Sequence, residues 1–229
     1  MKIHREFEQG SIDWFQARAG KVTASEMSNL VTPLAKVKTG DGPKTYLIER
    51  LAEVWTGSPI DGFSSWSTEQ GQFLEEAARP AFTLETGLDV EQVGFIESDD
   101  GKAGCSPDGI LTGKEIGLEI KCPGVVNHIR YLIDGKLPVD YVAQVQASIF
   151  ITGFSKWMFF SFRRKMPPLV LTVERDEAYQ QAISDALCEF SERFDANMKR
   201  LCEINGGPPK RITVPKKQPS PEPGFDVMP

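Results

Sequence analysis

The chain has 229 residues, 40% hydrophobic and 25% charged, which is the balance of a globular protein that can bury a core without disulfides or metals. Its formal net charge of −6 argues against binding of nucleic acid over the whole surface, but it leaves room for a local basic groove. There is no run of about 18 apolar residues, and residues 1–10 are polar, so we expect a cytoplasmic protein with no membrane span and no signal peptide.

The cysteines and histidines do not form a metal-binding pattern. These residues are Cys105, Cys122, Cys188, Cys202, His4 and His128. The cysteines contain no C-x-x-C pair, which disfavours zinc, redox and iron–sulfur motifs, and the two histidines are far apart. We therefore expect reduced, mostly buried thiols and no site built on histidine.

In the first half of the chain, the spacing of apolar and turn residues predicts helices joined by loops. Residues 11–27 favour a turn and short helical pieces, whereas residues 31–43 favour a loop. A helix is predicted over residues 45–55, and after another loop a second one runs from about residue 68 to residue 79. Pro80 should kink or end this second helix.

The second half alternates between strands and helices. Strand signals occur at residues 90–97, 109–112, 116–121, 156–162 and 169–173. Residues 139–152 predict a helix, and a long helix with an apolar stripe begins at Asp176 and stops at Gly206-Gly207-Pro208.

This order of elements predicts an α/β or α+β fold with a mixed central sheet flanked by helices. We expect a single domain over residues 1–207, followed by a Pro-rich tail over residues 208–229. The composition of the tail indicates a segment that is either disordered or laid against another surface.

The most informative polar residues surround the predicted strand 116–121. Asp108 lies in a Ser-Pro-Asp-Gly turn just before a strand, and Glu119 and Lys121 follow in a Gly-Leu-Glu-Ile-Lys-Cys-Pro stretch. Because side chains two apart on a strand point to the same face, Glu119 and Lys121 should lie together, while Ile120 points into the core. The carbonyl oxygen of Ile120 remains available as a ligand for a hard cation.

These residue types suit the cleavage of phosphodiesters. Two neighbouring carboxylates repel each other, and Mg²⁺, which prefers oxygen ligands, relieves that repulsion. The metal polarises a phosphate and lowers the pKa of a bound water, and Lys121 can stabilise the negative charge that develops. Taken alone, a Glu-x-Lys pair is also common on exposed strand faces, so a surface charge pair is the alternative.

Several stretches of the chain share a pattern with a known family. They are residues 14–18 with Gly20, 22–26, 71–75, 105–109, 117–123, 141–146 and 173–177. In this order they resemble the lambda-exonuclease-like viral-recombinase (alkaline exonuclease) family of the PD-(D/E)XK nuclease superfamily. The resemblance implies a PD-(D/E)XK nuclease core, and it covers roughly residues 14–192.

The resemblance also implies an activity and its partners. It implies a 5′→3′ exonuclease that degrades one strand of linear double-stranded DNA and leaves a 3′ single-stranded overhang for recombination by strand annealing. The implied cofactor is Mg²⁺, with two ions in the site and Mn²⁺ as a substitute. The implied assembly is a ring-shaped homotrimer that acts at double-stranded DNA ends and hands the overhang to a single-strand annealing protein.

Site residues follow from the matched motifs. The resemblance implies Asp108, Glu119 and the carbonyl of Ile120 as metal ligands, Lys121 as the catalytic lysine, and Glu75 as a further acidic ligand on the preceding helix. Without the family, Glu75 reads as a solvated helix charge.

A second set of residues is implied to form a pocket for the 5′ phosphate of DNA. This set is Arg18, Ser25, Ser106 and Gln144. Arginine suits bidentate phosphate contacts, although Arg18 and Ser25 taken alone read as a surface charge and a helix cap. Gln144 and Gln146 are two apart on a helix and cannot share a face, so one of them should be structural or solvent-facing. The family's apolar wedge has no clean match; Trp66 is the nearest candidate for stacking on a base.

Other functions remain open at this stage. Another PD-(D/E)XK enzyme, such as an endonuclease or a single-strand exonuclease, is the nearest alternative. A catalytically inactive DNA-binding module on the same fold is another. A carboxylate-metal hydrolase of small phosphates is the third, and the absence of a Gly-rich phosphate loop weighs against it.

Overall fold

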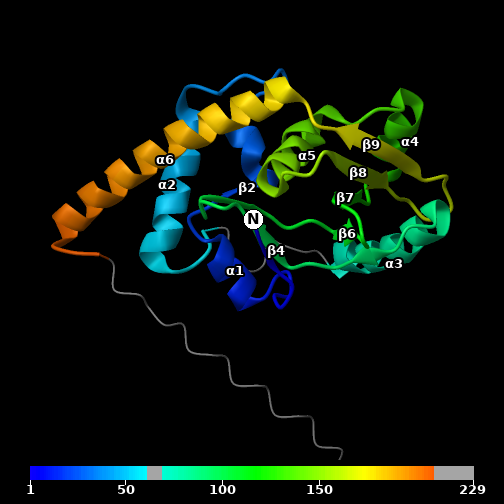
Figure 1. The fold of residues 1–229 in the computed structure, drawn as a ribbon, viewed down its shortest axis with the longest axis horizontal. Helices are drawn as coiled ribbons and strands as arrows, with labels where there is room; N and C mark the ends of the chain where they lie inside the picture. Colours follow the sequence, from blue (N-terminus) through cyan, green and yellow to red (C-terminus); the bar gives the residue numbers. More distant parts are fainter. Residues whose placement is uncertain (61–68, 209–229) are drawn as a thin grey trace, which may run out of the picture.

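A computed structural model of the chain describes residues 1–60 and 69–208, with side chains from Ala77 onward in the second range (Figure 1). The elements before the gap are β1 (Lys2–His4), α1 (Ile12–Arg18), β2 (Val22–Thr23), the 3₁₀ helix η1 (Ala24–Asn29) and α2 (Asp41–Thr56). Those that follow are α3 (Glu69–Thr86), β3 (Val90–Glu91), β4 (Phe95–Glu97), β5 (Ala103–Cys105), β6 (Gly109–Leu111), β7 (Ile116–Lys121), α4 (Val125–Asp134), α5 (Val139–Thr152), β8 (Lys156–Ser161), β9 (Leu169–Glu174) and α6 (Glu177–Asn205).

Two sheets organise these elements. The five-stranded sheet has the order β3-β6-β7-β8-β9, and only the β7–β8 pair in it is parallel. The four-stranded sheet has the order β1-β4-β5-β2, with β2 parallel to β5. The predicted mixed sheet flanked by helices is thus confirmed. The predicted strand 90–97 is divided between the sheets, as β3 and β4, whereas β1, β2 and β5, of two or three residues each, were not predicted.

The central strand β7 has two different faces. Leu118 and Ile120 are buried against Ala78 and Phe82 of α3, in the smaller of two hydrophobic clusters. Figure 1 shows α3 and α5 on opposite sides of this sheet, and α5 also packs against η1, β4, β5 and α6. Alternation along a strand therefore turns Glu119 and Lys121 toward α5.

Helix α3 continues through Pro80, so the prediction that the helix could end there was wrong. Pro80 is exposed, while Ala78 and Phe82 on either side of it are fully buried. The ring of Phe82 packs edge-to-face on Phe160, with centroids 5.3 Å apart. Burial of this apolar face offsets the roughly 3 kcal/mol that an internal proline costs.

Several other predicted boundaries hold. Helix α5 has the predicted limits, and α6 begins where Asp176 caps it by accepting hydrogen bonds from the amides of Ala178 and Tyr179. Helix α2 starts at Asp41, inside the predicted loop 31–43. Helix α4 was not predicted: no helix or strand was expected between residues 122 and 138. Among the helices that the structure describes, none has the length and apolar character needed to cross a membrane.

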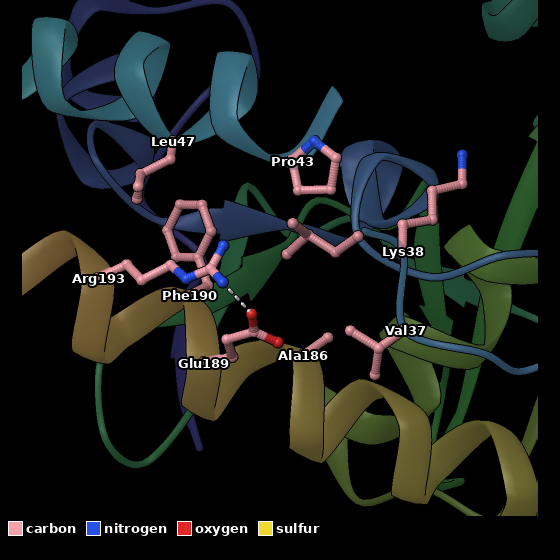
Figure 2. Close-up of a pocket in the computed structure, with 9 residues that line it drawn as sticks. Val37, Lys38, Pro43, Leu47, Ala186, Glu189, Phe190 and Arg193 are labelled. Atoms are coloured by element: carbon pink, nitrogen blue, oxygen red, sulfur yellow. Dashed lines mark ion pairs between the residues drawn. The ribbon is translucent and has the colours of Figure 1, made fainter. Parts of the chain in front are cut away.

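Helices α2 and α6 pack side by side, and a small pocket lies along their contact (Figure 2). Leu47 of α2 and Phe190 of α6 face each other there, and an ion pair joins Glu189 and Arg193 at 2.5 Å along α6. The lining is mostly apolar and contains none of the candidate site residues. We therefore regard the pocket as part of the helix packing.

Gly117 lies under the Trp157 ring, which allows a test of the packing on the α5 side of β7. A Cβ at Gly117 would lie 2.2 Å from a Trp157 ring carbon, and Trp157 is fully buried. Gly117→Ala should therefore lower the free energy of unfolding by about 1–3 kcal/mol, the usual cost of overpacking, as measured by urea denaturation. Gly42→Ala in α2 is the control, since a Cβ there meets nothing within 4 Å. Equal stability of the two variants would contradict this packing.

Candidate active site

Asp108 is attached to β7 through the backbone. Its amide donates to the Leu118 carbonyl at 3.1 Å, which extends the β6–β7 ladder by one residue. Its carboxylate oxygen Oδ2 accepts from the Ile120 amide at 2.5 Å. The Ser-Pro-Asp-Gly turn thus holds the Asp108 carboxylate beside the strand that carries Glu119 and Lys121.

Glu119 is a buried carboxylate with two donors on one oxygen. It is only 3% exposed, and its Oε1 lies 2.6 Å from Lys121 Nζ and accepts a 2.6 Å hydrogen bond from Gln144 Nε2. A buried carboxylate needs such compensation, because removal from water disfavours its charge. Asp108, Glu119 and Lys121, which we call the β7 cluster, are therefore brought together as predicted.

Lys121 keeps its positive charge in this setting. Burial acts to lower the pKa of its ammonium group, but the carboxylates of Glu119 and Asp108 outweigh burial and raise that pKa above its ordinary value. The ring of Tyr141 on α5 lies 5.1 Å from Nζ. At neutral pH, Lys121 can therefore donate hydrogen bonds and stabilise negative charge, but it is a poor base.

A second polar group, the Ser106 cluster, consists of Trp14, Arg18 and Ser106. The Ser106 hydroxyl accepts from Trp14 Nε1 at 2.9 Å and from Arg18 Nη1 at 3.2 Å. The Arg18 guanidinium stacks on the Trp14 ring, 4.1 Å from its centroid. Helix α1 thus presents Arg18 to a serine that lies two residues before Asp108, which joins this cluster to the β7 cluster.

Arg18 is charged at neutral pH despite its surroundings. Burial lowers the pKa of its guanidinium to about 10, and the carboxylates of Glu26 and Glu53 oppose that effect. Arg50 binds the same two carboxylates, at 3.1 Å each. A half-buried guanidinium that keeps its charge is suited to an anionic ligand.

Ser25 and Gln144 occupy different places. Ser25 is the second residue of η1, is exposed, and has its hydroxyl 3.3 Å from that of Thr23. The Gln144 side chain lies with the β7 cluster, where it donates to Glu119. The four residues predicted to bind the phosphate are thus not all together: Arg18 and Ser106 share a hydrogen bond, whereas Gln144 donates to Glu119.

Gln146 has the structural role that was predicted for one of the two glutamines. It is buried, donates to the Glu174 carbonyl at 2.9 Å, and accepts from the Asp176 amide and from Gln180 Nε2. These contacts tie α5 to the end of β9 and to the start of α6.

Two site residues were missed from the sequence. Tyr141 precedes Gln144 by three residues, a spacing that places both on one face of a helix and could have indicated it. Arg79 donates from Nε to the Asp108 carbonyl at 3.3 Å, and no sequence signal singled it out. The predicted Glu75 belongs to α3, but its side chain lies outside the described residues, as does all of Trp66.

The cysteines and histidines do not form a site of their own. All four cysteines are free thiols, and the described residues contain no group of three or more His, Cys, Asp or Glu placed to hold a metal. Burial, together with the charge of Glu119, raises the pKa of the Cys105 thiol, so this thiol stays protonated. His128 is buried, and its ring nitrogens form hydrogen bonds with the Ser161 hydroxyl and the Pro167 carbonyl.

Comparison with known proteins places this geometry in a family. The YqaJ-like viral recombinase domain matches residues 13–155, which is more than half of the chain and includes both polar clusters. The chain belongs to this family. No curated protein matches the sequence significantly.

Solved structures agree with the YqaJ-like assignment. The alkaline exonuclease LHK-Exo from Laribacter hongkongensis superposes with a TM-score of 0.75 at 28% identity, covering 86% of this chain and 98% of that one. A structure of LHK-Exo in complex with dAMP gives 0.74 at 29% identity with the same coverage. A phage-related exonuclease from Haemophilus somnus 129PT shares the fold, with a TM-score of 0.59 at 13% identity over 79% of this chain and 96% of that one.

The two glutamines of α5 provide a test of this division of roles. Gln146→Leu should lower the free energy of unfolding by roughly 1–3 kcal/mol for each buried partner left without a hydrogen bond. Gln144→Leu should cost less, because it removes one of the two donors to Glu119 and leaves Lys121 in place. Urea denaturation measures both. A larger loss for Gln144→Leu would contradict the structural role of Gln146.

Proposed function

We propose that the chain is a metal-dependent 5′→3′ exonuclease that degrades one strand of linear double-stranded DNA and leaves a 3′ single-stranded overhang. The observation that carries this proposal is the β7 cluster: a buried Glu119 paired with a protonated Lys121, beside Asp108, in a chain of the YqaJ-like family. The 28% identity to the alkaline exonuclease LHK-Exo, whose structure is known in complex with dAMP, supports this proposal.

The β7 cluster has oxygen ligands of the kind that bind a divalent cation. Asp108, Glu119 and the carbonyl of Ile120 are hard oxygen ligands of the kind that Mg²⁺ prefers. We propose Glu75 as the further acid, because it precedes Arg79 by four residues in α3, and Arg79 contacts Asp108. Two Mg²⁺ ions, replaceable by Mn²⁺, would lower the pKa of a bound water and polarise the scissile phosphate.

The protein's own groups have separate tasks around that centre. Lys121 donates hydrogen bonds to the developing negative charge at phosphorus. Gln144 holds the Glu119 carboxylate in place, and Asp108 is fixed by the Ile120 amide. This arrangement leaves little side-chain reorganisation for the reaction itself.

The Ser106 cluster is the proposed pocket for the 5′ phosphate. Arg18 is charged, half-buried and held by stacking on Trp14, and Ser106 adds a hydroxyl. Ser25 of η1 and Gln144 of α5 are proposed to border the pocket from different sides, Gln144 while it also donates to Glu119. A pocket that binds the 5′ phosphate beside the β7 cluster would explain why the enzyme needs a DNA end.

We also propose a ring-shaped homotrimer that encloses double-stranded DNA and hands the overhang to a single-strand annealing protein. Enclosure explains how a chain of net charge −6 stays on DNA, since topology replaces part of the electrostatic affinity.

Sedimentation equilibrium should give three times the chain mass of 25.4 kDa, and a monomer under active conditions would contradict the ring.

The proposed function is tested by comparing linear duplex DNA carrying 5′ phosphates with a closed circle, in Mg²⁺ and in EDTA. We expect loss of the linear DNA alone, only with metal, and with one strand shortened from its 5′ end. Cutting of the circle would favour a PD-(D/E)XK endonuclease, loss of single strands alone would favour a single-strand exonuclease, and no cutting would favour an inactive DNA-binding module.

Lys121→Ala tests the chemistry of the β7 cluster. It should slow cleavage by at least about 10²–10³-fold, the loss expected when a charge-stabilising donor is removed, while the affinity for DNA changes little. Single-turnover cleavage and fluorescence anisotropy measure the two effects. Lys102→Ala, at an exposed turn, is the control, and wild-type rates in Lys121→Ala would rule out this mechanism.

Arg18→Ala tests the phosphate pocket. Because the pocket is proposed to bind a terminal phosphate, the variant should lose much more activity on 5′-phosphorylated ends than on 5′-hydroxyl ends. Arg175→Ala, which removes an arginine paired with Glu177 outside both clusters, should leave the ratio of the two rates unchanged. Equal losses of Arg18→Ala on both substrates would remove the pocket assignment.

A further inference from the structure

Three consecutive basic residues lie in the turn between β8 and β9. Arg164 and Lys165 are exposed and Arg163 is half-buried. We call residues 162–168 the basic loop. It lies outside the part of the chain that matches the family domain, residues 13–155, and it concentrates positive charge in a protein of net charge −6.

The basic loop emerges beside the β7 cluster. Strand β8 is parallel to β7, and Lys121 is in register with Ser161. The carboxyl ends of both strands therefore meet at one edge of the sheet, where the Phe162 amide donates to the Lys121 carbonyl at 2.9 Å. Glu119 is in register with Phe159, and β8 ends two residues later at Ser161, about 7 Å further along the strand at about 3.3 Å per residue.

Contacts at both ends hold the basic loop in place. Arg163 Nη1 donates to the Pro123 carbonyl at 3.5 Å, and the Met166 amide closes a turn on the Arg163 carbonyl at 3.1 Å. At the far end, the buried His128 binds the Pro167 carbonyl at 2.9 Å. A loop that is already ordered loses little conformational entropy when it binds a ligand.

Lys165 has a backbone conformation that a glycine would adopt at lower cost. Its φ is +64°, in the left-handed region, where a residue with a Cβ is strained. A lysine at this position keeps a positive charge at the exposed tip of the turn. Strain retained at an exposed, charged position points to a binding role.

We propose that the basic loop binds backbone phosphates of the duplex a few base pairs ahead of the cut. This inference rests on the proposed exonuclease function. In the sheet order β6-β7-β8, Ser106 lies three residues before β6, on one side of β7, and the basic loop follows β8 on the other side. A duplex whose 5′ end is held at the Ser106 cluster would extend across β7 toward the loop.

The salt dependence of DNA binding tests this proposal. The double variant Arg164→Gln/Lys165→Gln should bind a 5′-phosphorylated duplex more weakly in EDTA. Its slope of log affinity against log salt should be smaller by about 0.9 for each phosphate that the loop no longer neutralises. Lys102→Gln/Lys114→Gln is the matched control: both lysines are exposed, and they lie just before β5 and β7, at the amino ends of these strands. The control should keep the wild-type slope.

Two further measurements separate phosphate binding from a structural effect. The charge-preserving variant Arg164→Lys/Lys165→Arg should restore the slope. Replacement of the phosphates a few positions from the 5′ end by neutral methylphosphonates should weaken binding of the wild type but not of the glutamine variant. An unchanged slope in the glutamine variant, or an equal fall in the control, would overturn the proposal. Cleavage of the same duplex by the wild type in Mg²⁺ tests the proposed function separately, because its absence would contradict the nuclease and not the binding result.

Discussion

The candidate site depends on the compensation of one buried carboxylate. Glu119 is almost fully removed from water, and its charge is stabilised by Lys121 and Gln144, each 2.6 Å from the same oxygen. In return, the carboxylates keep Lys121 protonated against the effect of its own burial. The ion pair therefore keeps Lys121 charged beside Glu119. A cation bound at the carboxylates would share that compensation, which is the basis for the metal centre that we propose here.

The sheet supports this arrangement by giving its central strand two faces. Leu118 and Ile120 anchor β7 in the apolar cluster under α3, and the alternation of the strand then directs Glu119 and Lys121 toward α5. The same helix supplies Gln144 and Tyr141 to the site and Gln146 to the packing against α6. Hydrophobic packing on one side of β7 thus positions the charges on the other.

The sequence predicted the parts of the fold that depend on local periodicity. Helix α5, the strands β7 to β9 and the Asp176 cap of α6 follow from spacing and turn residues, and Glu119 and Lys121 follow from alternation. Of the short strands in the second sheet, only β4 lies in a predicted strand; β1, β2 and β5 were not predictable, because pairing with other segments stabilises them and their own sequence does not. Pro80 was misjudged because the burial of Ala78 and Phe82 overrides a local preference. Arg79 could not be predicted either, since only the tertiary structure brings it to Asp108.

The most direct test of the central claim is to locate a cation at the β7 cluster. Anomalous diffraction from crystals of the protein soaked in Mn²⁺ would measure its position. We predict a peak within coordination distance, about 2.0–2.2 Å, of carboxylate oxygens of both Asp108 and Glu119, and its loss in Asp108→Asn. A peak elsewhere, or none at a Mn²⁺ concentration that supports cleavage, would contradict the view that these carboxylates form a metal centre.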